Sequence, residues 1–137
     1  MGNSFQLDVV TPERLLLTGK ATFITAPGQD GRFGVLAGHT PLISLLVPGE
    51  LLVVKEGSTD EHHFALSGGY AEVGNDRVTL LVERAVEKDL IDPRAAEAEE
   101  QEALERLTQL PHDGPESSIW KRRRDFARVC RRMVGMA

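Results

Sequence analysis

Residues 88–95, KDLIDPRA, separate two parts of the chain with different hydrophobic patterns. Before this stretch, short runs of Val, Leu, Ile, Phe and Thr alternate with turn-forming residues, a pattern typical of β-strands. Within it, Asp92 and Pro93 are typical of a helix N-cap followed by a proline in the first turn. After it, the chain is rich in Ala, Glu, Leu and Gln, which favour helix. The sequence therefore predicts an α+β fold with a boundary between residues 88 and 89.

The N-terminal part, residues 1–88, predicts an antiparallel β-sandwich of about ten short strands. Turns rich in Gly, Pro, Asn and Ser separate the apolar runs at 48–49, 57–58, 68–69 and 74–76. In the first run, Phe5, Leu7 and Val9 share one face, so we expect them in the core. The runs LLVV (51–54) and TLLV (79–82) are apolar on both faces, so we expect them at the centre of the sandwich.

The C-terminal part, residues 89–137, predicts an antiparallel hairpin of two α-helices. The first helix should extend from Asp92 to Leu110, and the second should run from about residue 116 to residue 133. We expect an apolar stripe on the first helix at Ala96, Ala103, Leu107 and Leu110. We expect another on the second helix at Ile119, Phe126, Cys130 and Met133, with Trp120 beside it.

Charge divides the hairpin more sharply than the formal net charge of −5 suggests. Residues 93–118 carry 2 basic and 7 acidic groups, whereas residues 119–137 carry 7 basic and 1 acidic group. Three interpretations of the basic helix stay open: ion pairs with Glu97, Glu99, Glu100, Glu102 and Glu105, an acidic protein partner, or nucleic acid. The acidic balance of the rest of the chain disfavours nucleic acid.

No constellation of catalytic, cofactor-binding or metal-ligating residues is predicted. The glycines at 28, 31 and 34 lack the spacing of a phosphate-binding loop, and strand-like sequence follows them instead of a helix. His39 has no nucleophile and acid in a recognisable triad with it. His62 and His63 alternate across a strand, so they cannot share a metal ion without outside ligands. Cys130 is the single cysteine, which excludes an internal disulfide, and we expect it to be buried.

Several motifs occur together in an order that resembles the epsilon subunit of F-type ATP synthases. They are DGRFGVLAGHTPL (30–42), LSGG (66–69), AEV (71–73), VTLLVE (78–83) and DLID (89–92), with FQLDVVTPERLLLTG at 5–19. The likeness covers residues 4–110, while the remainder matches in helical and basic character. The resemblance implies a β-sandwich followed by a helical hairpin at the foot of the central stalk.

The resemblance also implies a non-catalytic role in a rotary complex. Such a subunit couples rotation of the c-subunit ring to the gamma subunit during ATP synthesis driven by a proton or sodium gradient. Its partners are gamma, the c-ring and, when its helices extend and inhibit ATP hydrolysis, the alpha and beta subunits. The c-ring and gamma contacts would fall on Gly31, Arg32, Phe33, His39 and Pro41. The beta contacts in the extended state would fall on Arg122, Arg123, Arg124 and Arg128.

Two departures from the family pattern bear on function. Arg32 occupies a ring-facing position that is often acidic in the family. Some members bind ATP through I/L-D-x-x-R-A, but here Asp92 and Arg94 are separated by one residue only, which turns Arg94 by about 100° on a helix. With Asp92 required as an N-cap, we expect no bound ATP and no other cofactor.

The sequence also predicts where the chain resides. It contains no run of about 18 apolar residues and no signal-peptide or transit-peptide pattern at its start. We therefore expect a peripheral protein on the cytoplasmic face of a bacterial plasma membrane. The alternative to a stalk subunit is a stand-alone adaptor that binds nucleic acid through the basic C-terminal helix, which salt-sensitive binding by the isolated chain would reveal.

Overall fold

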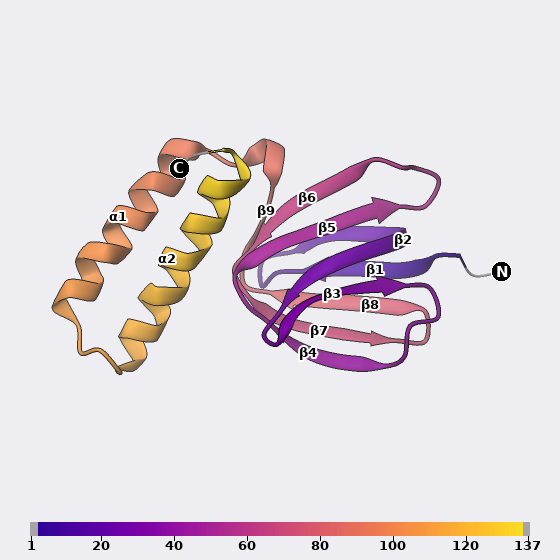
Figure 1. Ribbon diagram of the computed structural model, residues 1–137, viewed down its shortest axis with the longest axis horizontal. Helices are drawn as coiled ribbons and strands as arrows, with labels where there is room; N and C mark the ends of the chain where they lie inside the picture. The colour runs from indigo at the N-terminus through magenta and orange to yellow at the C-terminus, as the bar shows by residue number, and fades with distance from the viewer. Residues whose placement is uncertain (1–2, 136–137) are drawn as a thin grey trace.

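The computed structural model describes residues 3–135, in which nine strands precede two α-helices (Figure 1). The strands are β1 (Phe5–Val10), β2 (Leu15–Gly28), β3 (Gly31–Leu36), β4 (Leu42–Leu46), β5 (Gly49–Lys55), β6 (Glu61–Leu66), β7 (Gly69–Gly74), β8 (Arg77–Val82) and β9 (Ala85–Glu87). A short 3-10 helix, η1 (Lys88–Leu90), leads into α1 (Pro93–Gln109) and α2 (Pro115–Met133). The predicted β-sandwich followed by a helical hairpin is confirmed.

Strand β2 is long enough to take part in both layers of the sandwich. Its N-terminal half pairs with β1, and its C-terminal half pairs with β3 and β5. One layer continues from β1 through β8 and β7 to β4, and the other continues from β5 through β6 to β9. The β1–β8 pair is parallel, so the expected fully antiparallel arrangement is wrong at this one place. These strands are far apart in the sequence, and no hairpin turn fixes their relative direction.

The core follows the alternation that the sequence predicts, with one exception. Phe5, Leu7 and Val9 are all at most 2% exposed. In the TLLV run, however, Leu80 is buried but Leu81 is 51% exposed, so the expectation that both faces are covered is wrong there. Strand β8 lies between β1 and β7 within its layer, yet nothing in residues 3–135 covers its outer face.

The helical hairpin forms where the sequence predicts it. The Asp92 carboxylate accepts hydrogen bonds from the backbone N–H groups of Arg94 (3.0 Å) and Ala95 (3.3 Å), which confirms its role as the N-cap of α1. Helix α2 starts with Pro115 at its first position, after Gly114 as the N-cap residue. Both helices end within one residue of the predicted position.

Helix α2 lies between α1 and the sandwich, against β6 and β5 (Figure 1). A second apolar cluster forms there, from Ala65 of β6, Ala96 of α1 and Phe126, Val129 and Cys130 of α2. The prediction for the apolar faces is therefore right for Ala96, Phe126 and Cys130. It is wrong for Ile119, which is 52% exposed, because the first turns of α2 diverge from the sandwich.

A buried carboxylate joins the two helices. Glu100 of α1 is 5% exposed, and it accepts a hydrogen bond from Nε of Arg128 (2.7 Å) and a second from Arg131. The hydrogen bond from Arg128 lowers the pKa of Glu100 below its ordinary value, with the hydrogen bond and charge of Arg131 adding to it, although burial opposes the shift. The folded hairpin therefore favours the ionised carboxylate.

We expect Glu100→Gln to lower the free energy of unfolding by about 1–3 kcal/mol at pH 7, since it removes the charged acceptor of the hydrogen bonds from Arg128 and Arg131. A carboxylate with a lowered folded-state pKa contributes stability above its unfolded pKa of about 4.3 and loses it as the pH falls through the folded value. The difference between wild type and variant in urea unfolding should thus shrink on acidification from pH 7 to about pH 3. Glu97→Gln, at an exposed position of the same helix, is the control and should change little.

Among the described glycines, Gly69 has the least room for a side chain. Its φ is +150°, and a Cβ there would lie 2.0 Å from the carbonyl oxygen of Leu81. We expect Gly69→Ala to cost roughly 3 kcal/mol or more in urea unfolding. Gly57 has a φ of +82° and open space around it, so an alanine there is strained in its backbone but clashes with nothing. Gly57→Ala should therefore cost only about 1 kcal/mol. Equal costs at the two positions would contradict this account.

Candidate functional site

A row of exposed apolar side chains crosses the outer face of one layer of the sandwich. Leu45 of β4 stands opposite Tyr70 of β7, and Tyr70 stands opposite Leu81 of β8. These three side chains are 44%, 56% and 51% exposed, and the row continues to the half-buried Val10, which pairs with Leu81. A contiguous apolar surface of this kind marks a binding face for another macromolecule.

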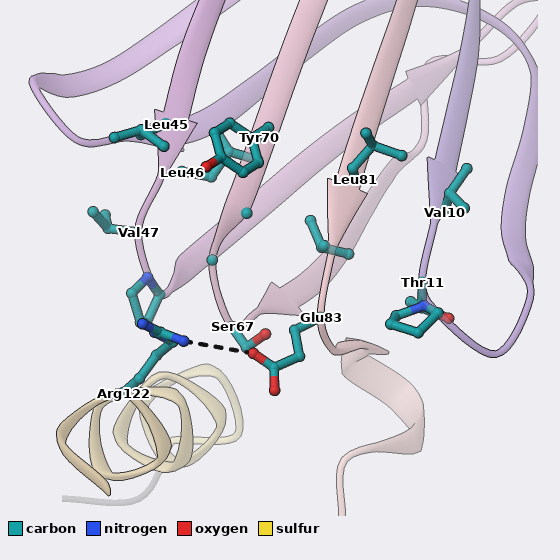
Figure 2. A pocket seen from close by; sticks show the side chains of 15 residues that line it. Val10, Thr11, Leu45, Leu46, Val47, Ser67, Tyr70, Leu81, Glu83 and Arg122 are labelled. Atoms are coloured by element: carbon teal, nitrogen blue, oxygen red, sulfur yellow. Dashed lines mark ion pairs between the residues drawn. The ribbon is translucent and has the colours of Figure 1, made fainter. Parts of the chain in front are cut away.

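The row borders a groove of about 660 Å³ where the sandwich meets the hairpin (Figure 2). Its walls come from the outer face of β4, β7 and β8, the turns at 10–12 and 46–48, and residues 67–69. One residue of the hairpin, Arg122 of α2, also lines it, and its guanidinium lies 3.7 Å from the carboxylate of Glu83. A shallow apolar groove with a single ion pair at one end suits a protein segment rather than a reacting small molecule.

The titratable residues considered in the sequence are not gathered into a reactive site. The carbonyl oxygen of Thr40 accepts a hydrogen bond from His39 Nδ1 (2.6 Å), while His63 pairs with Glu50 and lies 3.6 Å from Glu61. Within residues 3–135, no three His, Cys, Asp or Glu side chains converge as metal ligands. Burial raises the pKa of Cys130 to about 11, which opposes a nucleophilic role.

The residues expected to contact the c-ring and gamma do not form a compact loop. Residues 31–36 are strand β3, so Gly31 and Arg32 lie at one end of the sandwich, where Arg32 donates a hydrogen bond to the Thr25 hydroxyl (2.7 Å). His39 and Pro41 lie beyond the other end of β3, close to the β7–β8 turn. Residues 31–36 form a strand because Phe33 and Val35 alternate with exposed neighbours and pair with β2.

All of β3 nevertheless lies along one edge of the sandwich. Among the described strands it pairs with β2 alone, so its other backbone edge is open. Arg32, Gly34, Leu36 and Pro41 are exposed along it, while Phe33 and His39 are half-buried. The five residues predicted to contact the c-ring and gamma therefore lie along one edge of the sandwich and do not form a compact patch.

Each of the four arginines expected to contact beta has a carboxylate partner within the folded chain. Arg123 and Arg128 pair with Glu99 (3.9 Å) and Glu100 (2.7 Å) of α1. Arg122 pairs with Glu83 of the sandwich, and Arg124 pairs with the adjacent Asp125 (2.9 Å). The intramolecular interpretation of the charge pattern is therefore right for Glu99 and Glu100. The other three predicted members, Glu97, Glu102 and Glu105, are exposed to solvent.

Two residues between β8 and β9 were missed by sequence reasoning. Glu83 and Arg84 contact the hairpin from the sandwich side, and Arg84 bonds to Glu99 while its guanidinium lies 4.3 Å from the ring centroid of Phe126. The only signal in the sequence is a pair of opposite charges directly after an apolar strand.

Neither helix of the described chain combines the length and apolar character that a membrane crossing requires.

Comparison with known proteins gives consistent results at three levels. Residues 4–88 match the family described as ATP synthase, Delta/Epsilon chain, beta-sandwich domain. The ATP synthase epsilon chain of Magnetococcus marinus is 43% identical over 128 residues, covering 93% of this chain and 91% of the relative. That of Desulfosudis oleivorans is 44% identical over 107 residues, covering 78% and 80%.

Among solved structures, a chain of the mitochondrial ATP synthase of Euglena gracilis shares the fold. It superimposes with a TM-score of 0.79 at 24% identity, covering 98% of this chain and 83% of that one. The family match spans most of the sandwich, and the relatives extend the similarity through the hairpin. The chain therefore belongs to the ATP synthase epsilon-chain family.

Proposed function

We propose that this chain is a non-catalytic rotor subunit of the central stalk, which couples rotation of the c-ring to gamma and carries a hairpin that inhibits ATP hydrolysis. The observation that carries the proposal is the exposed apolar row of Leu45, Tyr70 and Leu81, together with membership of the family. On this proposal the chain is peripheral, held through the ring at the cytoplasmic face of a bacterial plasma membrane. It has no cofactor of its own.

The apolar row and its groove are the proposed docking surface for gamma. The row spans four adjacent strands, so its side chains are held by a rigid layer and lose little freedom on binding. Aromatic residues at the centre of such a patch are among those that supply most of the binding energy of protein interfaces. Tyr70 is the central member of the row.

The β3 edge is the proposed contact with the c-ring. A six-residue strand is roughly 20 Å long, so a flat ring surface reaches Gly31, Arg32 and Phe33 at one end and His39 and Pro41 at the other only when it lies along the strand. The Arg32 guanidinium is exposed on this edge. A carboxylate on the ring would be its natural partner, since arginine and carboxylate form a bidentate pair.

The hairpin is the proposed brake. Arg122, Arg123, Arg124 and Arg128 have partners in the folded state, so extension toward beta exchanges one set of ion pairs for another. The exposed pairs among them contribute only about 0–1 kcal/mol each, so the pair of Arg128 with the buried Glu100 is the main one that extension has to replace. A differential binding energy of about 5.5 kcal/mol is enough to shift such an equilibrium almost completely.

Truncation after Lys88 tests the brake, because it removes the hairpin and retains β9, which ends at Glu87. The truncated chain should still bind gamma, and the reassembled complex should hydrolyse ATP faster than the complex with the full chain. Unchanged hydrolysis would remove the inhibitory role. Loss of gamma binding in a folded truncated chain would remove the role assigned to the sandwich.

Leu81→Glu tests the docking surface. A carboxylate in the middle of the apolar row should weaken gamma binding roughly tenfold or more, while folding is unaffected because the side chain is already half exposed. Leu90→Glu, at a 73% exposed leucine outside the groove, is the matched control. Titration of gamma with each variant, with a circular dichroism spectrum of each, measures the effect. Equal affinity of both variants would show that gamma docks elsewhere.

A further inference from the structure

Glu83 and Arg84, which connect β8 to β9, contact both helices of the hairpin with opposite charges. We infer that these two residues form a clasp that holds the folded hairpin against the sandwich and must release before the hairpin can extend. The regulatory meaning of the clasp rests on the proposed brake, but the clasp itself is a property of the chain alone.

Arg84 forms the stronger arm. Its Nη1 and Nη2 donate to the two oxygens of Glu99 on α1, at 2.5 and 3.1 Å. The same guanidinium lies over the ring of Phe126 on α2, with its carbon 4.3 Å from the ring centroid. A bidentate pair and a cation–π contact thus join one sandwich residue to both helices at once. Phe126 is 1% exposed, so the guanidinium contacts a ring that is already excluded from water.

Glu83 forms the weaker arm. Its carboxylate lies 3.7 Å from Arg122 on α2, and both side chains are more than half exposed. An exposed pair at this distance contributes little by itself. It lies, however, in the wall of the groove beside the apolar row, as Figure 2 shows. This arm is therefore the part of the clasp that a protein in the groove can reach.

The backbone of the clasp is anchored to the sandwich by Ser67. The Ser67 hydroxyl accepts a hydrogen bond from the Arg84 N–H (2.8 Å), and the Ser67 N–H donates to the Arg84 carbonyl (3.0 Å). Ser67 is 4% exposed. Because the backbone is fixed before the helices dock, the side chain of Arg84 has less freedom to lose on contact with Glu99.

The clasp matters because the apolar contact beneath it is small. On the sandwich side the second cluster contains Ala65, with Val86 and Ile91 packed at its border. An alanine offers little surface for Phe126 to cover, so polar and cation–π contacts contribute a larger share of docking here than in the sandwich core. Loss of the Arg84 arm should therefore raise the undocked population measurably.

Cys130 provides a native probe of undocking. It is the single cysteine, 5% exposed in the cluster under α2, and a thiol reagent reaches it only when the hairpin leaves the sandwich or unfolds. We expect Arg84→Ala to raise the rate of Cys130 labelling by an aromatic disulfide reagent about tenfold, which corresponds to about 1.4 kcal/mol in the opening equilibrium. Arg84 lowers the pKa of Cys130, so its removal alone would slow labelling, and faster labelling reports opening.

Arg84→Lys should raise the rate less than Arg84→Ala, by about threefold, because the ammonium keeps a positive charge beside Glu99 and Phe126 but loses the bidentate pair. Glu83→Gln should raise the rate only about twofold, and Glu97→Gln is the control with no expected change. Hydrogen exchange of the strand amides in each variant reports whether the sandwich itself has stayed folded.

Labelling of Arg84→Ala within twofold of wild type would overturn the clasp, as would an Arg84→Lys variant that labels as fast as Arg84→Ala. These outcomes are independent of the brake. If truncation after Lys88 raises hydrolysis while Arg84→Ala labels slowly, the brake stands without the clasp. If labelling accelerates and truncation leaves hydrolysis unchanged, the clasp stands without the brake.

Discussion

The small contact between α2 and the sandwich is the constraint on which the arrangement of the whole chain depends. Phe126 is buried in a cluster to which the sandwich contributes Ala65, with the half-buried Val86 of β9 at its border, so docking buries little apolar area. Hydrogen bonds from Arg128 and Arg131 to Glu100 join the two helices to each other. The contact between the helices is therefore stronger than the contact between the hairpin and the sandwich. The hairpin can therefore leave the sandwich before its two helices separate and exchange their own ion pairs for others.

The same alternation that builds the sandwich also creates its binding face. In β8, Val78, Leu80 and Val82 enter the core, and this forces Leu81 to the outside, where Tyr70 and Leu45 extend the row. Exposure of these three apolar side chains to water is unfavourable in free energy. Their exposure is explained by a partner that covers them, since apolar patches of this kind mark interaction surfaces.

Local patterns in the sequence predicted the strands and helices. Features that depend on contacts between residues distant in the sequence were not predicted. The alternation of Phe5, Leu7 and Val9 and the cap at Asp92 depend on neighbouring residues, and both were predicted correctly. The parallel direction of β1 and β8 and the exposure of Ile119 depend on where remote segments lie. In the candidate site, the arginines of α2 were identified from composition, but their partner Glu83 and the neighbouring Arg84 were not. No periodic pattern marks a residue that acts across a domain boundary.

Glu83 links the two surfaces that the proposed function uses. It pairs with Arg122 of the hairpin, and it lines the groove that borders the apolar row. A partner that contacts this pair only while the hairpin is docked binds the docked state more tightly, and by linkage the docked hairpin strengthens the binding of that partner. The exposure of the pair keeps this coupling small, so in the proposed function gamma can stay on the sandwich while the hairpin extends. In this proposal the sandwich and the hairpin bind different partners and share only the weak Glu83–Arg122 pair. The rotor subunit can then remain assembled whether the hairpin is docked or extended.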